Sequence, residues 1–167
     1  MPCTVRPVSS RGRIDPPVLG WREWVSLPQW DVAYLKAKVD TGARTSSLHA
    51  FDLEWFERDG ASWVRFEIHP WQRSTADSVV AEAAVVSTRD IRSSSGAVDH
   101  RPVVRTSVGL AGATVEAEIT LTRRDDMGFR MLIGREAIRR RFVVDPGTSY
   151  RGGRPPKDVR LRNRRRP

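Results

Sequence analysis

The sequence predicts an all-β domain, a small barrel or closed sandwich with one short helix near its end. Two observations predict this class of fold. Apolar and polar residues alternate along several segments, and only one segment has helical spacing. A chain of 167 residues suits a single domain of ordinary size with one hydrophobic core.

The alternation has a period of two, which is typical of strands that bury one face. It is clearest from Ala113 to Leu121, where apolar side chains at every second position oppose Thr and Glu. A Gly109–Gly112 turn joins this segment to the strand before it. The expected strands, in chain order, are Ala33–Val39, Ser62–Ile68, Val79–Thr88, Pro102–Val108 and Ala113–Leu121.

Only Arg135–Phe142 has helical spacing, because Ile138 and Phe142 lie four residues apart. The segment is short, and it is followed by the strand-like pair Val143-Val144. One brief helix near the end of the domain is therefore expected.

Charge divides the chain into three parts. The formal net charge is +9, yet residues 151–167 hold eight Lys and Arg against one Asp, and residues 1–13 hold three Arg and no acid. The remaining body is close to neutral. We expect a flexible N-terminal arm (1–18), a folded domain (19–150) and a disordered Arg-rich tail (151–167). The tail is either simply solvated or contacts an acidic partner such as RNA or a ribosome surface.

Other features of composition restrict the class of protein. A single cysteine, Cys3, excludes an intramolecular disulfide framework. No apolar run resembles a signal peptide or is long enough to span a bilayer, so a cytoplasmic protein without membrane contact is expected. The six Trp residues are not regularly interleaved with Lys and Arg, which favours packing over base stacking for most of them.

Two short motifs carry the chemistry. The first, Val39-Asp40-Thr41-Gly42-Ala43, places an Asp-Thr-Gly where an expected strand ends. Taken alone it is an ordinary turn, because Asp and Gly both tolerate turn geometry. The second, Leu132-Ile133-Gly134-Arg135, joins an apolar run to the expected helix.

In this order, the two motifs resemble the catalytic loop and the strand-to-helix junction of retropepsin-type aspartic proteases. The runs KVDTGARTSSLHA and MLIGREAI are similar to those of a bacterial RimK-associated retropepsin-like group, also labelled ATP-dependent zinc proteases. The resemblance covers about residues 20–150. It implies a closed retropepsin-like barrel and an aspartic endopeptidase.

Such an enzyme needs two carboxylates that share one proton. At a separation of about 4 Å they repel by roughly 4 kcal/mol, about three pKa units, so one stays protonated. This chain has one Asp-Thr-Gly, since Asp126-Met127-Gly128 and Asp145-Pro146-Gly147 lack the hydroxyl residue. The resemblance therefore implies a homodimer in which Asp40 of each copy completes the site.

The resemblance also assigns roles to further residues. Thr41 would hydrogen-bond across the dimer, and Gly42 would let substrate approach the backbone. Ala43 and Arg44 would contact substrate, as would Ser94, Ser95 and Gly96 in a candidate lid that is equally well an ordinary surface loop. Ile133, Gly134 and Arg135 would support the loop. Arg44 stands where viral enzymes have an acidic residue, so an Arg44–Glu136 pair is conceivable and Arg135 needs another partner.

Neither ATP nor zinc is expected. The chain has no phosphate-binding Gly-rich loop with Lys and no His-Glu-x-x-His, and its three histidines lack paired ligand spacing. We therefore expect no cofactor and no metal. The expected partners are a second copy and a peptide or protein substrate, which is acidic if the protein trims glutamate tails. The alternative is a non-catalytic barrel that scaffolds an acidic partner through its basic tail.

Overall fold

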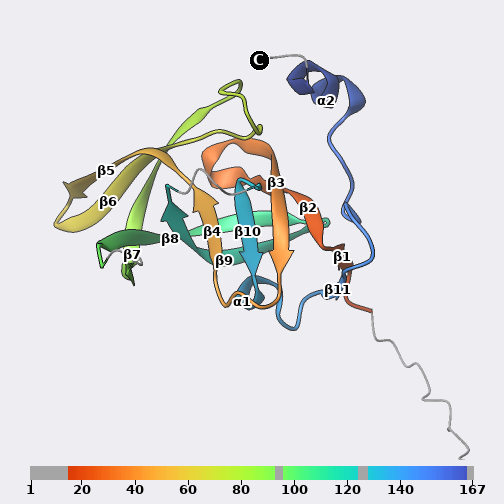
Figure 1. The fold of residues 1–167 in the computed structure, drawn as a ribbon, viewed down its shortest axis with the longest axis horizontal. Coiled ribbons are helices and arrows are strands. Elements are labelled where there is room, and N and C mark those ends of the chain that lie inside the picture. Colours follow the sequence, from red (N-terminus) through yellow and green to blue (C-terminus); the bar gives the residue numbers. More distant parts are fainter. Residues whose placement is uncertain (1–14, 93–95, 124–127, 165–167) are drawn as a thin grey trace, which may run out of the picture.

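A computed structural model of the chain describes residues 15–92, 96–123 and 128–164. Within these ranges the chain consists mostly of strands, as the period of two predicted (Figure 1). The strands are β1 (Val18–Gly20), β2 (Arg22–Leu27), β3 (Val32–Asp40), β4 (Ser46–His49), β5 (Phe51–Arg58), β6 (Ala61–Ile68), β7 (Val79–Arg92), β8 (Val98–Leu110), β9 (Ala113–Thr122), β10 (Met131–Gly134) and β11 (Val143–Asp145). The helices are a 3-10 turn (Pro28–Trp30), α1 (Arg135–Ile138) and α2 (Lys157–Arg164).

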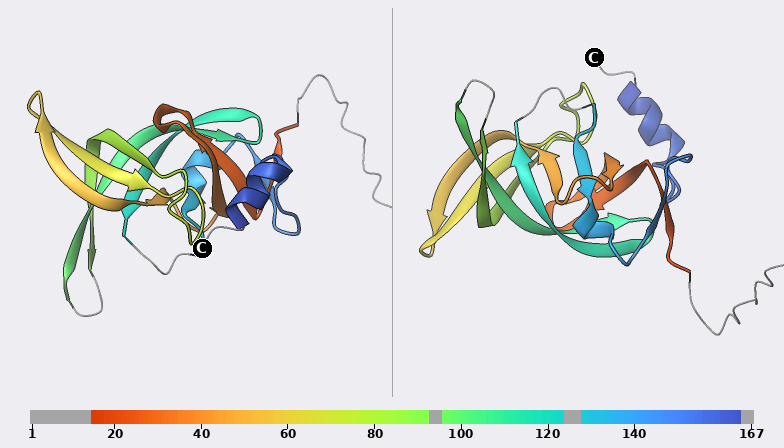
Figure 2. Two further views of the ribbon diagram at one scale, coloured as in Figure 1. Left: turned by 90° about the horizontal axis from the view of Figure 1, so that it is seen from above. Right: turned by 60° about the horizontal axis from the view of Figure 1, so that its bottom comes forward.

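Six strands close into a barrel in the order β2-β3-β10-β4-β9-β8. The long strand β8 closes the barrel because its last residues pair with β2, in the register Val25↔Leu110 and Ser26↔Gly109. From β8 the sheet continues outward through β7, β6 and β5. The β5–β6 and β7–β8 hairpins therefore project from one side of the barrel (Figure 2).

The core fills the barrel with the apolar positions that the alternation marked. Val39 and Leu35 of β3 face inward with Ile133 of β10 and Ile119 of β9. Leu35, Ile119 and Ile133 are fully buried, and each such burial stabilises the fold by about 1.5–3 kcal/mol. The strands that carry the two motifs are thus fixed by the centre of the core.

The five predicted strands are confirmed as β3, β6, β7, β8 and β9, with small differences at their ends. The predicted helix is shorter than expected, because α1 ends at Ile138 instead of Phe142. No helix in the described ranges has both the length and the apolarity to cross a bilayer.

The expectation that residues 151–167 are disordered is wrong for residues 151–164. Glu23, which is fully buried, accepts hydrogen bonds from the amides of Gly20 (2.6 Å), Arg151 (2.9 Å) and Gly152 (3.1 Å). These bonds attach the start of the tail to β2, and α2 follows. Composition missed this order because the attachment depends on a carboxylate far away in the sequence.

Candidate active site: the Asp40 loop

Two neighbouring parallel strands position the candidate site. β10 pairs with β3 in the register Ile133↔Val39 and Gly134↔Asp40. The two sequence motifs therefore end side by side at the same edge of the barrel, next to α1 (Figure 1). The two ends that meet here, Asp40 and Gly134, are 94 positions apart in the sequence, which is compatible with a parallel pair because such a pair cannot be joined by a tight turn.

Asp40 shapes its own loop. Its Oδ1 accepts the amide of Gly42 at 2.9 Å and the amide of Ala43 at 3.1 Å. The side chain is half-buried, while Thr41 and Gly42 are exposed. No hydrogen bond or ion pair from the described part of the chain engages Oδ2. The carboxylate is thus oriented through one oxygen, and the other is available for chemistry.

The start of α1 braces this loop. The amides of Arg135 and Glu136 donate to the carbonyl oxygens of Ala43 (2.7 Å) and Arg44 (3.0 Å). The Arg135 guanidinium donates through Nη1 to the carbonyl oxygen of Thr41 at 3.0 Å. Arg135 therefore does find another partner, and it is the backbone of the Asp40 loop.

Gly134 is required by the close approach of the loop. A Cβ at this position would lie 2.3 Å from the carbonyl carbon of Thr45, a separation that real side chains do not adopt. The Gly134 amide donates to the buried Ser46 hydroxyl at 3.1 Å. The glycine thus lets β10 and the chain after Asp40 pack backbone to backbone.

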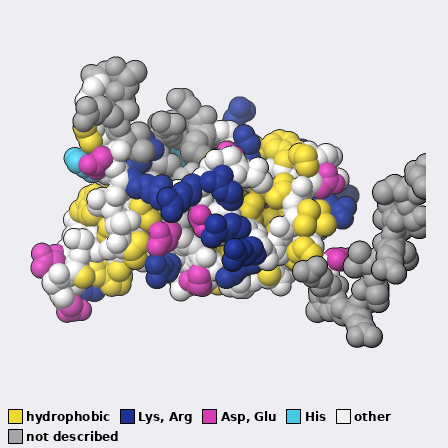
Figure 3. Space-filling view, turned by 90° about the horizontal axis from the view of Figure 1, so that it is seen from below, with side chains coloured by type: hydrophobic (Ala, Val, Ile, Leu, Met, Phe, Trp, Pro, Cys, Tyr) yellow, Lys and Arg dark blue, Asp and Glu magenta, His cyan; other side chains and the backbone are white. Residues whose placement is uncertain are grey.

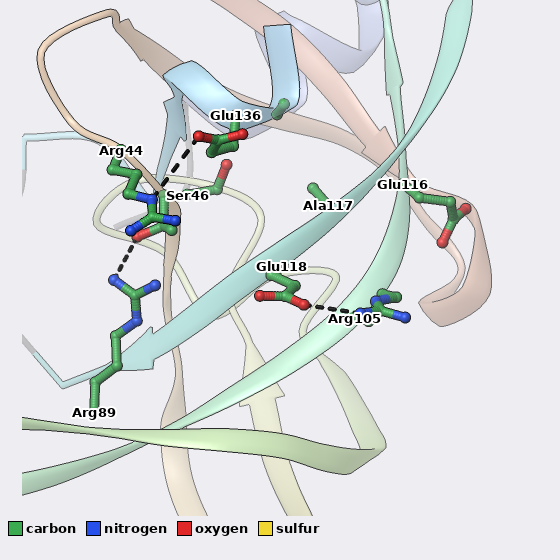
Figure 4. Close-up of a pocket in the computed structure, with 10 residues that line it drawn as sticks. Arg44, Ser46, Arg89, Arg105, Glu116, Ala117, Glu118 and Glu136 are labelled. Carbon is green, nitrogen blue, oxygen red and sulfur yellow. Dashed lines mark hydrogen bonds and ion pairs between the residues drawn. The ribbon is translucent and has the colours of Figure 1, made fainter. Parts of the chain in front are cut away.

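A cleft of about 400 Å³ opens beside the loop (Figure 4). Arg44 lines it and lies 3.8 Å from Glu136, a long contact between exposed groups that adds little stability. Arg89 reaches over from β7 and donates to the Thr45 hydroxyl at 2.8 Å. Farther along the cleft, Arg105 pairs with Glu118 at 2.8 Å.

One face of the molecule is rich in basic side chains. Seen from below, Lys and Arg gather over the middle of the molecule, with a few acidic groups between them (Figure 3). The cleft itself mixes both signs, since Glu116, Glu118 and Glu136 line it with the three arginines. Among the residues that the structure describes, no three His, Cys, Asp or Glu side chains are grouped closely enough to hold a metal ion.

The structure brings together the residues of the two motifs. Ile133 is fully buried in the core. Gly96 lies between β7 and β8, and the end of β7 and the start of β8 that flank it lie away from α1 in the ribbon views (Figures 1 and 2). Ser94 and Ser95 lie outside the described residues, so the lid stays a prediction.

Sequence reasoning missed Ser46, Thr45 and Arg89. Ser46 and Thr45 carry no local signal, because they meet Gly134 and Arg89 only through the fold. Arg89 carries none, since it reaches the loop only through the pairing of β7 with β8.

A closed barrel with an Asp-Thr-Gly loop that is hydrogen-bonded to a helix beginning with Gly-Arg is typical of a retropepsin-like protein. The sequence model of the family described as "Retropepsin-like aspartic endopeptidase RimB" matches residues 18–155. The chain belongs to this RimB-like family, and the resemblance stated from the motifs is confirmed.

Individual relatives agree with this assignment. The chain is 44% identical over 133 residues to a "Probable alpha-L-glutamate ligase" of Shewanella halifaxensis, and 44% identical over 136 residues to one of Parasynechococcus marenigrum. These matches cover 80% and 81% of this chain but only 29% of each relative. A crystal structure of protein Lpg0085, of unknown function, from Legionella pneumophila superposes with a TM-score of 0.69 at 27% identity, covering 81% of this chain and 98% of that one.

Proposed function

We propose that this protein is an aspartic endopeptidase whose catalytic dyad consists of Asp40 from each of two copies of the chain. One observation carries the proposal. Asp40 ends a core strand, its Oδ1 is fixed by two amides, and its Oδ2 has no partner from the described residues. A carboxylate held in this way is preorganised for proton transfer.

The chemistry requires the pair to hold one proton. The ionised Asp40 takes a proton from a water molecule, whose oxygen attacks the scissile carbonyl carbon, while the protonated Asp40 donates its proton to the carbonyl oxygen. Collapse of the resulting gem-diol breaks the C–N bond. The leaving nitrogen takes the proton of the protonated Asp40, and one diol hydroxyl returns its proton to the ionised Asp40, so the dyad again holds one proton. The apparent pKa values belong to the pair and not to either copy.

A second copy supplies the missing carboxylate in this proposal. Each chain has a single Asp-Thr-Gly, so one copy provides half of the dyad. Thr41 and Gly42 are exposed on the single chain, which leaves both available to a facing loop. Arg135 and the α1 amides hold the loop in shape before it meets its partner.

Acidic peptides are the substrate class that fits best. The relatives that match this chain over 29% of their length are named "Probable alpha-L-glutamate ligase", and a peptidase that acts on glutamate-rich peptides would suit that association. Arg44 and Arg89 line the cleft beside the Asp40 loop and offer guanidinium groups to carboxylates.

Asp40→Asn tests the catalytic assignment, and Asp145→Asn is its matched control. Asn keeps the Oδ1 acceptor of the turn, so both variants should fold normally. Asp145 also accepts the amide of the glycine two residues later at 2.9 Å. We expect Asp40→Asn to lower the rate of cleavage of fluorogenic acidic peptides by about 10²- to 10⁴-fold. Asp145→Asn should leave that rate unchanged. Equal activity of wild type and Asp40→Asn would reject the proposal.

Mixing the two proteins tests the dimer. If each site needs two Asp40 side chains, adding folded Asp40→Asn protein to a fixed amount of wild type should inhibit cleavage, because mixed dimers are inactive. The control is the same addition of Asp145→Asn, which should raise cleavage instead. Sedimentation that finds an active monomer would contradict the shared dyad.

The alternative function, a scaffold that contacts an acidic partner through the tail, makes the opposite prediction. In that case Asp40→Asn changes nothing, and truncation after residue 150 abolishes a salt-dependent interaction. The braced geometry of Asp40 favours the peptidase over a scaffold that uses the tail alone.

A further inference from the structure

The end of the molecule away from α1 carries a second cleft, of about 510 Å³. Its lining residues come from β2, β3, the segment 70–72, the segment 150–154 and α2. The ribbon view shows α2 far from α1 (Figure 1). Lys36, which lines it, precedes Asp40 by four residues on β3, roughly 13 Å along a strand. The cleft is therefore distinct from the one beside the Asp40 loop.

The charge of this cleft is of one sign. Its lining includes Arg22, Lys36, Arg154, Lys157 and Arg160, and none of the described residues that line it is acidic. No ion pair within the described ranges involves any of these five cations. The first cleft differs in this respect, since three glutamates line it and Arg44 and Arg105 both pair there. Unpaired cations held close together repel, and a bound polyanion relieves that repulsion.

Aromatic rings orient the cations without neutralising them. The guanidinium carbons of Arg22 and Arg154 lie 5.0 and 4.6 Å from the Tyr150 ring centroid, and Lys36 Nζ lies 5.2 Å from that of Trp24. Trp24 itself stacks on Tyr150 at 6.1 Å. Such contacts fix the side chains while their positive charge stays available.

Two of the arginines, Arg22 and Arg160, are each held by a hydrogen bond from Nε. Arg22 donates Nε–H to the Ser149 hydroxyl at 3.1 Å, and Arg160 donates Nε–H to the Pro155 carbonyl oxygen at 3.0 Å. In the described part of the chain neither guanidinium makes a hydrogen bond or ion pair through its terminal nitrogens. That pair of nitrogens is the edge that binds phosphate in a bidentate manner.

We infer that this cleft binds single-stranded nucleic acid, with phosphates on the five cations and bases against Trp24, Tyr150 and the stacked guanidinium planes. Bases stack on aromatic rings and on arginine planes alike, and a cleft of this volume accommodates a nucleotide. An acidic peptide would use the cations but not the apolar aromatic surface. The cleft could not be predicted from the sequence. Its rings and cations come from β2, β3, residues 150–154 and α2, and these segments meet only in the fold.

The test measures binding of the full chain to a labelled single-stranded RNA of about twelve nucleotides by fluorescence anisotropy, across a salt series. The variant Lys36→Gln/Arg154→Gln removes two cations of the cleft. The control Arg58→Gln/Arg65→Gln removes the same charge from the β5–β6 hairpin and leaves the basic tail intact. We expect about tenfold weaker binding for the first variant, a salt slope smaller by roughly 1 to 1.5, and less than about twofold change for the control.

Competition identifies the ligand class. Unlabelled single-stranded RNA should displace the probe better than inorganic polyphosphate or oligoglutamate of equal charge. Asp40→Asn should bind RNA as tightly as wild type, which separates this site from the proposed peptidase. Equal affinities of the cleft and hairpin variants overturn the inference, and so does equal or better competition by polyphosphate or oligoglutamate.

Discussion

The Asp40 loop and the Asp145 loop are local copies of one backbone device. Each Asp ends a strand of a parallel pair opposite a glycine, in the registers Gly134↔Asp40 and Gly20↔Asp145. In each loop Oδ1 accepts the amide of the glycine two residues later at 2.9 Å. A local turn that satisfies its own amides is a general way to end a strand, and here it is used twice.

The match extends one step further along both loops. The residue after each partner glycine donates its amide to the carbonyl three positions past the Asp: Arg135 to Ala43 at 2.7 Å, and Trp21 to Thr148 at 2.9 Å. What differs is the surroundings. The Asp40 loop carries Thr at its centre and is braced by α1, whereas the Asp145 loop carries Pro and leads into the segment bound to Glu23. The turn is therefore structural in both places, and any chemistry depends on what surrounds it.

The largest stability effect should come from filling the two glycines. In Gly134→Ala the new Cβ would lie 2.3 Å from Thr45 backbone, and in Gly20→Ala it would lie 2.5 Å from the Thr148 carbonyl oxygen. We expect each to lower the free energy of unfolding by about 2–3 kcal/mol, measured in urea, because backbone must move. Gly128→Ala, which meets nothing within 4 Å, is the control and should be near neutral.

Gly134→Ala and Gly20→Ala also test whether the Asp40 loop and the Asp145 loop differ in function. If only the Asp40 loop is catalytic, Gly134→Ala should lose peptidase activity even where it is still folded, and Gly20→Ala should keep it. Equal loss of activity in both folded variants would show that the loops are not separable.

Sequence reasoning reached the Asp40 loop because its parts are local. Asp40 to Ala43 and Gly134-Arg135 are short motifs, and the alternation in β3, β6, β7, β8 and β9 is visible residue by residue. It dismissed Asp145-Pro146-Gly147 as catalytic, but it did not see that the same turn recurs there. That likeness depends on the pairing of β1 with β11, which joins residues 125 positions apart. Strands as short as β1 and β11 are too short to show a period.

The next largest effect should come from Glu23, whose hydrogen bonds hold the segment after the Asp145 loop but not the Asp40 loop. Glu23→Gln replaces one carboxylate oxygen by an amide nitrogen that cannot accept, so one of its three amide donors loses its partner. Hydrogen bonds to charged groups contribute about 1.5–3 kcal/mol, and we expect a loss of about 2 kcal/mol. Hydrogen exchange should accelerate at residues 151–152 and not at Gly42 or Ala43. Glu54→Gln, at an exposed position, is the control. Faster exchange in both regions would mean that the Glu23 hydrogen bonds stabilise the Asp40 loop as well.

A smaller effect is expected from the brace on the Asp40 loop. Arg135→Met removes the donor to the Thr41 carbonyl but keeps the apolar stem of the side chain. Since this bond is exposed, stability should fall by less than about 1 kcal/mol, while cleavage should fall by about tenfold as the loop loses its orientation. Arg139→Met on the same turn, where the arginine pairs with Glu136 at 3.5 Å, should change neither. A loss of activity in both variants would indicate a general charge effect.

The smallest effect concerns pH and a carboxylate outside both loops. A hydrogen bond from the Ser78 hydroxyl lowers the pKa of Glu67 from its ordinary 4.5, and the neighbouring His69 adds to this against the opposing effect of burial. Because the folded pKa is the lower one, the ionised Glu67 stabilises the fold above about pH 4.5, and this contribution is lost as the pH falls through the folded value. The free energy of unfolding measured in urea should therefore be lower for Glu67→Gln than for wild type near neutral pH. The two values should converge in acid. A constant difference across that range would mean that Glu67 acts through packing and not through its charge.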